Sequence, residues 1–142
     1  QHLRKPRTFT AMTPEQKLKH LILLKQQSWG EDFLKDVAIT SENVDELYES
    51  HDENWELQDA RSEVRGSAIP TGLLADYSRH YESKAVAAKY IDGSWVGWTY
   101  WYGGGKHGEP EGIDWMDDAY AVDCVEEEKM VVVRTFTKEI GT

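Results

Sequence analysis

The sequence predicts a single α+β domain in which N-terminal helices pack on a C-terminal antiparallel sheet of about four strands. Apolar residues recur at helical spacing in the first half of the chain, whereas beyond about residue 80 the spacing shortens to the period of two expected of strands. An Asp92-Gly93 pair between two strand-like segments is a strong hairpin signal. The 142 residues suffice for one folded unit with its own core. We therefore expect one domain over residues 12–142.

Residues 1–11 are expected to lie outside this domain. They carry three basic residues and no acidic residue, and they show neither a helical nor a strand period. The sequence begins with Gln1, whereas Met12 stands directly before the first helix signal. We expect a flexible basic segment, or a remnant of cloning, at residues 1–11.

The clearest helix is predicted over residues 13–29. Thr13, Pro14 and Gln16 match a capping box with proline at the first helical position. Apolar residues follow at helical spacing, and Gly30 ends the helix. The expected apolar face consists of Leu18, Leu21, Ile22, Leu24 and Trp29.

A second helix is predicted from about Glu42 to Val64, with an apolar stripe that runs to Trp55. Nine acidic residues between positions 41 and 63 stand against the single base Arg61, so this segment holds −8 of the net charge of −10. Like charges one turn apart each cost about 0.2–0.5 kcal/mol. We therefore expect this helix to depend on packing of its stripe.

Two strands, residues 81–91 and 95–102, are expected to pair through the Asp-Gly turn. A two-residue loop would place Ala87 opposite Trp98, whereas a three-residue loop with a bulge shifts the register by one residue. The sequence leaves both registers open.

The second strand of this hairpin carries aromatic rings on both faces. Trp95 and Trp101 share one face, and Trp98, Tyr100 and Tyr102 share the other. A strand that faces solvent on one side rarely carries tryptophan there. We expect burial on both sides, with a groove in which the rings stack on a ligand as the alternative.

Two further strands are expected over residues 119–125 and 130–138, joined by the acidic turn EEEK. Cys124 alternates with Tyr120 and Val122 on the first of them. It is therefore expected to be a small buried residue rather than a catalytic nucleophile.

Composition and charge disfavour several classes of function. A net charge of −10 opposes direct binding to nucleic acid or to an anionic membrane, which relies on clustered lysine and arginine. The longest apolar run, Leu21 to Leu24, is far shorter than the ~20 residues of a membrane span, and no signal-peptide pattern is present. No P-loop, dinucleotide-binding or cysteine-cluster pattern is present, so no cofactor or metal is expected. These observations predict a soluble cytoplasmic protein.

The acidic segment is the strongest functional lead. Carboxylates spaced along a rod imitate the charges of a nucleic-acid duplex and suit a basic cleft on a nucleic-acid-binding protein. We therefore expect an acidic protein-interaction module, acting as an inhibitor or nucleic-acid mimic, rather than an enzyme. A solvated face that only keeps the protein soluble is the alternative. The expected partner-binding residues are Glu46, Glu49, Asp52, Glu53, Glu56 and Asp59.

Two other classes of function stay open. A metal-assisted hydrolase would use His80, His107, Glu109 and Glu111, although their spacing matches no known zinc motif. A small-ligand module would combine aromatic rings with the glycine-rich loop after residue 102, where exposed backbone N–H groups and a lysine suit an anion. Its expected ligand-binding residues are Trp98, Tyr100, Lys106 and His107.

The stretch SRHYESKAVAAKYIDGSWVGWTYWYGGGKHGEPEGIDWMDDAYAVDCVEEEKMVVVRTF resembles small uncharacterised proteins carried by bacteriophages and other bacterial mobile elements. The resemblance covers a little under half of the chain. It implies a context in which small acidic proteins often block a host factor. It brings no known active site and assigns a role to no residue.

Overall fold

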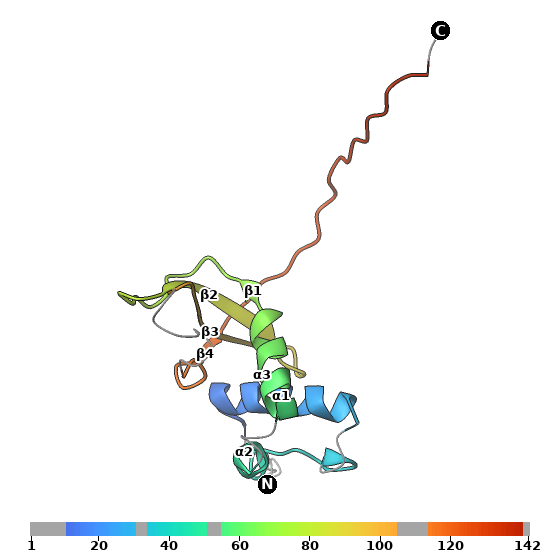
Figure 1. The fold of residues 1–142 in the computed structure, drawn as a ribbon. Coiled ribbons are helices and arrows are strands. Elements are labelled where there is room, and N and C mark those ends of the chain that lie inside the picture. The colour runs from blue at the N-terminus through green and yellow to red at the C-terminus, as the bar shows by residue number, and fades with distance from the viewer. Residues whose placement is uncertain (1–10, 31–33, 51–54, 105–113, 141–142) are drawn as a thin grey trace, which may run out of the picture.

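The computed structural model describes residues 11–30, 34–50, 55–104 and 114–140. The helices are α1 (Pro14–Ser28), α2 (Val44–Glu49) and α3 (Trp55–Gly66). The strands are β1 (Ile69–Pro70), β2 (Glu82–Lys89), β3 (Trp95–Tyr102) and β4 (Tyr120–Val122). They form one sheet in the order β1-β2-β3-β4, with every neighbouring pair antiparallel (Figure 1). The predicted α+β fold with a four-stranded antiparallel sheet is therefore confirmed.

Helix α1 begins as the sequence predicts. The Thr13 side chain accepts a hydrogen bond from the Gln16 backbone N–H at 3.1 Å, and the Gln16 side chain accepts one from the Thr13 N–H at 3.0 Å. Trp29 caps the other end, and Gly30 leaves the helix with a φ of +83°, a conformation that glycine adopts without strain. Both ends of the helix are thus determined by local chemistry.

The buried face of α1 differs in part from the predicted one. Leu18, Ile22 and Leu23 are fully buried, whereas Trp29 is 45% exposed. Leu18, Ile22 and Gln26 follow each other at intervals of four residues and define the centre of the buried stripe. The predicted face is therefore confirmed at its centre and wrong at Trp29, which lies at the C-cap.

The acidic segment does not form the single helix that the sequence predicts. Helix α2 ends at Glu49 and α3 begins at Trp55. The predicted stripe includes Trp55, yet Trp55 is 84% exposed and Leu57, two residues later, is fully buried. Two residues correspond to about 200° around a helix, so the buried faces of α2 and α3 are out of phase. Two separate helices allow each face to reach the core.

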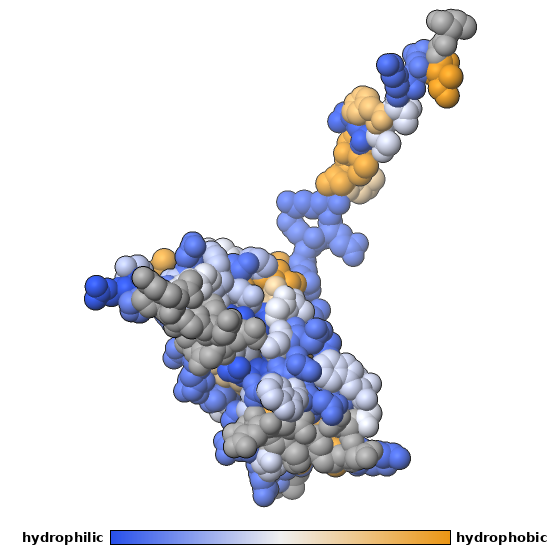
Figure 2. Space-filling view, viewed as in Figure 1, coloured by the Kyte–Doolittle hydropathy of each residue, from blue (hydrophilic) through white to orange (hydrophobic). Residues whose placement is uncertain are grey.

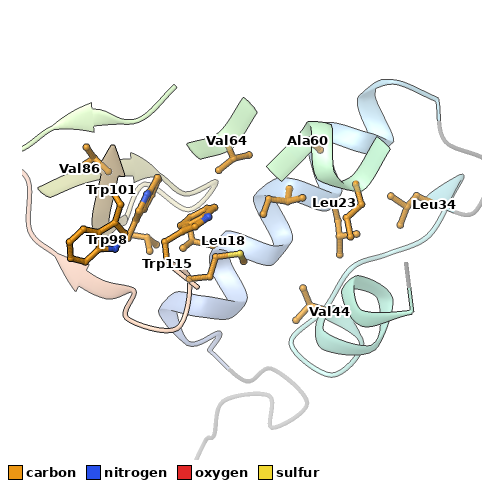
Figure 3. Packing of buried hydrophobic residues seen from close by; sticks show 14 residues of the cluster. Leu18, Leu23, Leu34, Val44, Ala60, Val64, Val86, Trp98, Trp101 and Trp115 are labelled. Carbon is orange, nitrogen blue, oxygen red and sulfur yellow. The ribbon is translucent and has the colours of Figure 1, made fainter. Parts of the chain in front are cut away.

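The core lies between the helices and one face of the sheet. Val86 and Trp98 of the sheet lie beside Leu18 of α1 and Val64 of α3 (Figure 3), and Val96 belongs to the same buried cluster. The Trp98 and Trp115 rings pack with their centroids 5.2 Å apart. Burial of an aromatic ring of this size removes much apolar area from water, so this pair anchors the core.

The hairpin takes the three-residue loop of the two that the sequence allows. The Tyr90 N–H donates to the Ser94 carbonyl at 2.7 Å, and Gly93 has a φ of +93°. A left-handed glycine at the end of a three-residue loop is typical of a bulged hairpin turn. The resulting register places Val86 opposite Trp98.

Strand β3 is buried over most of its length on both sides, as the sequence predicts. One side faces the helices. On the other side, Thr99 and Trp101 are also buried, and the Thr99 hydroxyl lies 3.4 Å from a carboxylate oxygen of Asp76 in the loop before β2. The Tyr120 ring covers Gly97, where an added Cβ would come within 2.7 Å of it. This close approach explains a glycine in the middle of a strand.

The predictions for the C-terminal segment are wrong. Of the strand expected over residues 119–125, only β4 forms, and Cys124 is exposed rather than buried. No strand forms over residues 130–138, which are exposed throughout. Residues 123–140, which we call the C-terminal arm, extend away from the body (Figure 1). The arm has a strand-like sequence without a neighbouring strand, and pairing depends on such a neighbour.

Within the part of the chain that the structure describes, no helix combines the length and the apolar character needed to cross a membrane.

Candidate acidic surface

The predicted partner-binding residues lie on two helices. Glu46 and Glu49 are exposed on α2, and Glu56 and Asp59 are exposed on α3. Asp52 and Glu53 lie outside the described residues. These carboxylates therefore do not follow one continuous rod.

Part of this acidic surface lies around Lys19 of α1. Its Nζ atom lies 3.0 Å from an Asp45 carboxylate oxygen, 3.7 Å from Glu49 and 3.8 Å from Glu15. The Lys19 side chain is 10% exposed, whereas its three partners retain more contact with water. A nearly buried cation thus holds three carboxylates from α1 and α2 at the surface.

These contacts change the protonation behaviour of the groups. Burial acts to lower the pKa of Lys19, but the hydrogen bond and charge of Asp45, together with Glu15 and Glu49, raise it above its ordinary value. The pKa of Asp45 is lowered by hydrogen bonds from Gln16 and then from Lys19. Both members of the Lys19–Asp45 pair are therefore held in their charged forms.

Besides Lys19, Glu15 also interacts with the acidic residues Asp114 and Asp117. Burial raises the pKa of Glu15; Lys19 opposes this shift, while Asp117 and Asp114 add to it. The pKa of Asp114 is also raised, by burial and then by the hydrogen bond and charge of Asp117, against a smaller opposing effect of Arg61. Like charges in contact favour the protonated form. Asp117 thus disfavours the ionised forms of Glu15 and Asp114.

We call Glu15, Asp45, Glu49, Asp114 and Asp117 the acidic cluster. Of these, only Glu49 is among the predicted partner-binding residues. Glu15 comes from α1, Asp45 from α2, and Asp114 and Asp117 precede β4. The abundance of acids in each segment is visible in the sequence, but their convergence depends on how α1 packs against α2 and the segment before β4.

Two of the residues predicted for a small ligand, Trp98 and Tyr100, lie on β3 among the described residues. Trp98 is fully buried against Trp115, so its ring faces no solvent. Tyr100 is half-buried, with the Arg65 guanidinium 4.0 Å and Lys84 Nζ 5.3 Å from its ring centroid. Lys106 and His107 lie outside the described residues.

Three of the four residues predicted for a metal site, His107, Glu109 and Glu111, lie outside the described residues. His80 is exposed in the loop before β2. Among the residues that the structure describes, no three His, Cys, Asp or Glu side chains are grouped so that they could hold one metal ion. The carboxylates of the acidic cluster are among these residues and form no such group.

A hollow of about 620 Å³ lies beside the hairpin turn and contains a histidine that sequence reasoning passed over. The Nδ1 atom of His20 lies 2.5 Å from the Tyr90 hydroxyl, and both side chains are buried. Lys17 and Met12 also line the hollow. Burial lowers the pKa of His20. No motif marks this pair in the sequence, since 70 residues separate its members.

Comparison of the chain with protein-family models, with curated proteins and with solved structures gives no match.

Proposed function

We propose that this protein is a protein-interaction module that binds a basic partner protein through its acidic surface. The surface comprises the acidic cluster and the neighbouring exposed carboxylates of α2, including Glu46. The observation that carries the proposal is the placement of Asp117 beside Glu15 and Asp114, where burial raises the pKa of both groups and Asp117 adds to that rise.

The linkage between protonation and binding supports this proposal. A basic side chain placed beside these carboxylates would favour their ionised forms, and the ionised forms would in turn bind the basic side chain. Asp114 and Asp117 are exposed, so a partner can reach them. Complementary charge also speeds association between proteins.

The arrangement of the carboxylates favours a basic protein surface over a metal ion. The described residues contain no group of three ligands suited to a single ion. Arginine and lysine side chains of a protein can instead reach several separate carboxylates at once. Because α2 and α3 are separate helices, we propose a compact acidic surface rather than a rod that imitates a duplex.

The class of partner follows from charge and from the sequence resemblance together. Proteins that bind nucleic acid present the basic surfaces that this cluster complements. The resemblance to bacteriophage proteins supports a bacterial host factor as the target, which the acidic surface would block in the cytoplasm. Inhibition of a host nucleic-acid-binding protein is thus the specific form of the proposal.

The experiment is affinity capture from bacterial lysate with two variants of equal net charge. Glu46→Lys/Asp117→Lys changes the acidic surface and places a cation beside Glu15 and Asp114, which favours the folded state. Glu63→Lys/Glu128→Lys makes the same change in net charge at exposed positions outside the cluster. Captured proteins are identified by mass spectrometry at low and high salt.

We expect wild type and the Glu63/Glu128 variant to capture the same partner, and we expect high salt to release it. The Glu46/Asp117 variant should bind that purified partner at least about tenfold more weakly, which corresponds to about 1.4 kcal/mol. Equal loss in both variants would mean that only total charge matters. Equal retention of the partner by both variants would show that the acidic surface does not bind it.

A further inference from the structure

The C-terminal arm leaves large apolar side chains in water. Met130 is 100% exposed, Phe136 is 86% exposed, and the three valines between them are at least 74% exposed. Figure 2 shows hydrophobic side chains along the arm and a second hydrophobic patch on the body beside its base. Contiguous exposed apolar surface of this kind typically marks an interaction site.

The sequence of the arm has the composition of a strand. Residues 130–138 read MVVVRTFTK, with five β-branched residues and neither glycine nor proline. An extended segment of this type satisfies its backbone N–H and C=O groups best by pairing with the edge of a sheet. The arm therefore needs an edge to pair with, rather than a groove for a helix.

The body offers one suitable edge. β1 and β4 are the outer strands of the sheet, and β1 contains Pro70, which has no N–H to donate. β4 consists of Tyr120, Ala121 and Val122, and no strand among the described residues lies on its outer side. The outer edge of β4 is thus the better acceptor.

The arm does not turn back onto the β4 edge of its own chain. Glu126 forms an ion pair with Lys89 of β2 at 3.5 Å, which directs the base of the arm across the sheet. From there the arm leads away from the body (Figure 1). A second copy of the chain carries the same open edge.

Charge also suits a second copy. Residues 130–138 contain Arg134 and Lys138 and no acid, whereas acidic residues flank β4 on both sides, at Asp117, Asp118 and Asp123. An apolar hollow of about 430 Å³ lies over the sheet between β1 and β4, where the base of the arm at Asp123 to Glu126 lines it together with Ile69 and Trp95.

We propose that the protein forms a two-fold dimer by exchanging C-terminal arms. Residues 130–136 of one copy add to the outer edge of β4 of the second copy as a fifth strand, and the second copy returns the same contact. Exchange of identical elements closes with two-fold symmetry and leaves neither arm unpaired. This inference rests on the arm and β4, so it does not depend on the acidic surface binding a partner.

Sedimentation analysis of the full chain from about 1 to about 100 µM tests the proposal, because dimers dissociate by mass action on dilution. Val132→Pro removes an N–H from the middle of the pairing stretch. Glu139→Pro makes the same substitution in the same arm beyond that stretch. Because both positions are exposed, both variants should fold, and circular dichroism checks that they do.

Wild type and Glu139→Pro should dimerise over this range, and the dissociation constant of Val132→Pro should rise at least about tenfold. A wild type that stays monomeric at the highest concentration would overturn the proposal and leave the arm to a different protein. A Val132→Pro variant that dimerises as wild type does would also overturn it. A Glu46→Lys/Glu56→Lys variant, which changes exposed acids of α2 and α3 and none beside β4, should retain the dimer, which separates this test from that of the acidic surface.

Discussion

β3 and the C-terminal arm carry the two most strand-like sequences of the chain, and the structure treats them in opposite ways. β3 pairs with β2 along all of its eight residues and is buried on both faces. The arm has more β-branched residues than β3, five over residues 130–138 against two, but it has no neighbouring strand and its apolar side chains are exposed. A strand-like sequence thus specifies an extended segment, while pairing and burial depend on an available edge.

The largest effect is expected where β3 meets the helices. Trp98→Ala should lower the free energy of unfolding by about 3–5 kcal/mol, because the ring is fully buried against Trp115. Trp55→Ala is the matched control, since Trp55 is 84% exposed, and should change it by less than about 0.5 kcal/mol. Urea denaturation at low protein concentration measures both. Similar losses in the two variants would contradict the assignment of the core.

A smaller effect is expected where β3 meets β4. Gly97→Ala should lower the free energy of unfolding by about 1–3 kcal/mol, because its Cβ would come within 2.7 Å of the Tyr120 ring. At Gly66, the last residue of α3, an added Cβ meets no atom within 4 Å. Gly66→Ala should therefore raise the free energy of unfolding, by up to about 1 kcal/mol. A Gly97→Ala variant with an undiminished free energy of unfolding would show that Tyr120 does not lie on β3 in solution.

A third test uses pH at the buried His20. Its folded pKa lies below the ordinary value of 6.5, so between these two values the unfolded state binds more protons than the folded state. The contribution of neutral His20 to the free energy of unfolding should therefore be complete above pH 6.5. It should be lost as the pH falls from 6.5 through the folded pKa. Thermal unfolding of His20→Gln should lose this step, while the exposed control His80→Gln should keep it. A step that persists in His20→Gln would assign it to another group.

The smallest effect is expected in the acidic cluster. Asp117→Asn removes the like charge beside Glu15 and Asp114, so the pKa of both should fall toward their ordinary values of 4.5 and 3.8. Because ionising these two groups then costs less in the folded state, stability above their pKa should rise by a few tenths of a kcal/mol, about the size of a like-charge pair on a helix. NMR titration of the side-chain carboxyl carbons measures the shifts. Asp123→Asn, at an exposed position beyond β4, is the control and should leave both pKa values unchanged.

The features that could be predicted from sequence are those determined by neighbouring residues. The capping box of α1, the glycine after it and the hairpin turn each depend on a few adjacent side chains. The two-sided burial of β3 also follows from the rings it carries. The sequence left the hairpin register open because both loops use the same Asp-Gly pair.

The predictions that failed concern features that depend on packing between segments far apart in the sequence. A continuous helical period suggested one acidic helix, but the buried faces at Val44 and Leu57 require two. The convergence of Glu15, Asp45 and Asp117 needs the positions of three segments. The strand-like composition of residues 130–138 predicted a strand that the structure does not contain, because composition does not reveal whether a sheet edge lies next to the segment.

Hydrogen–deuterium exchange at about 1 and about 100 µM protein tests the contrast between β3 and the arm most directly, because exchange reports which amides are hydrogen-bonded. We expect β3 amides to be protected at both concentrations. Amides of residues 131–136 and of β4 should become protected together only at the higher concentration. Arm amides that exchange equally fast at both concentrations would show that the arm does not pair with a second copy.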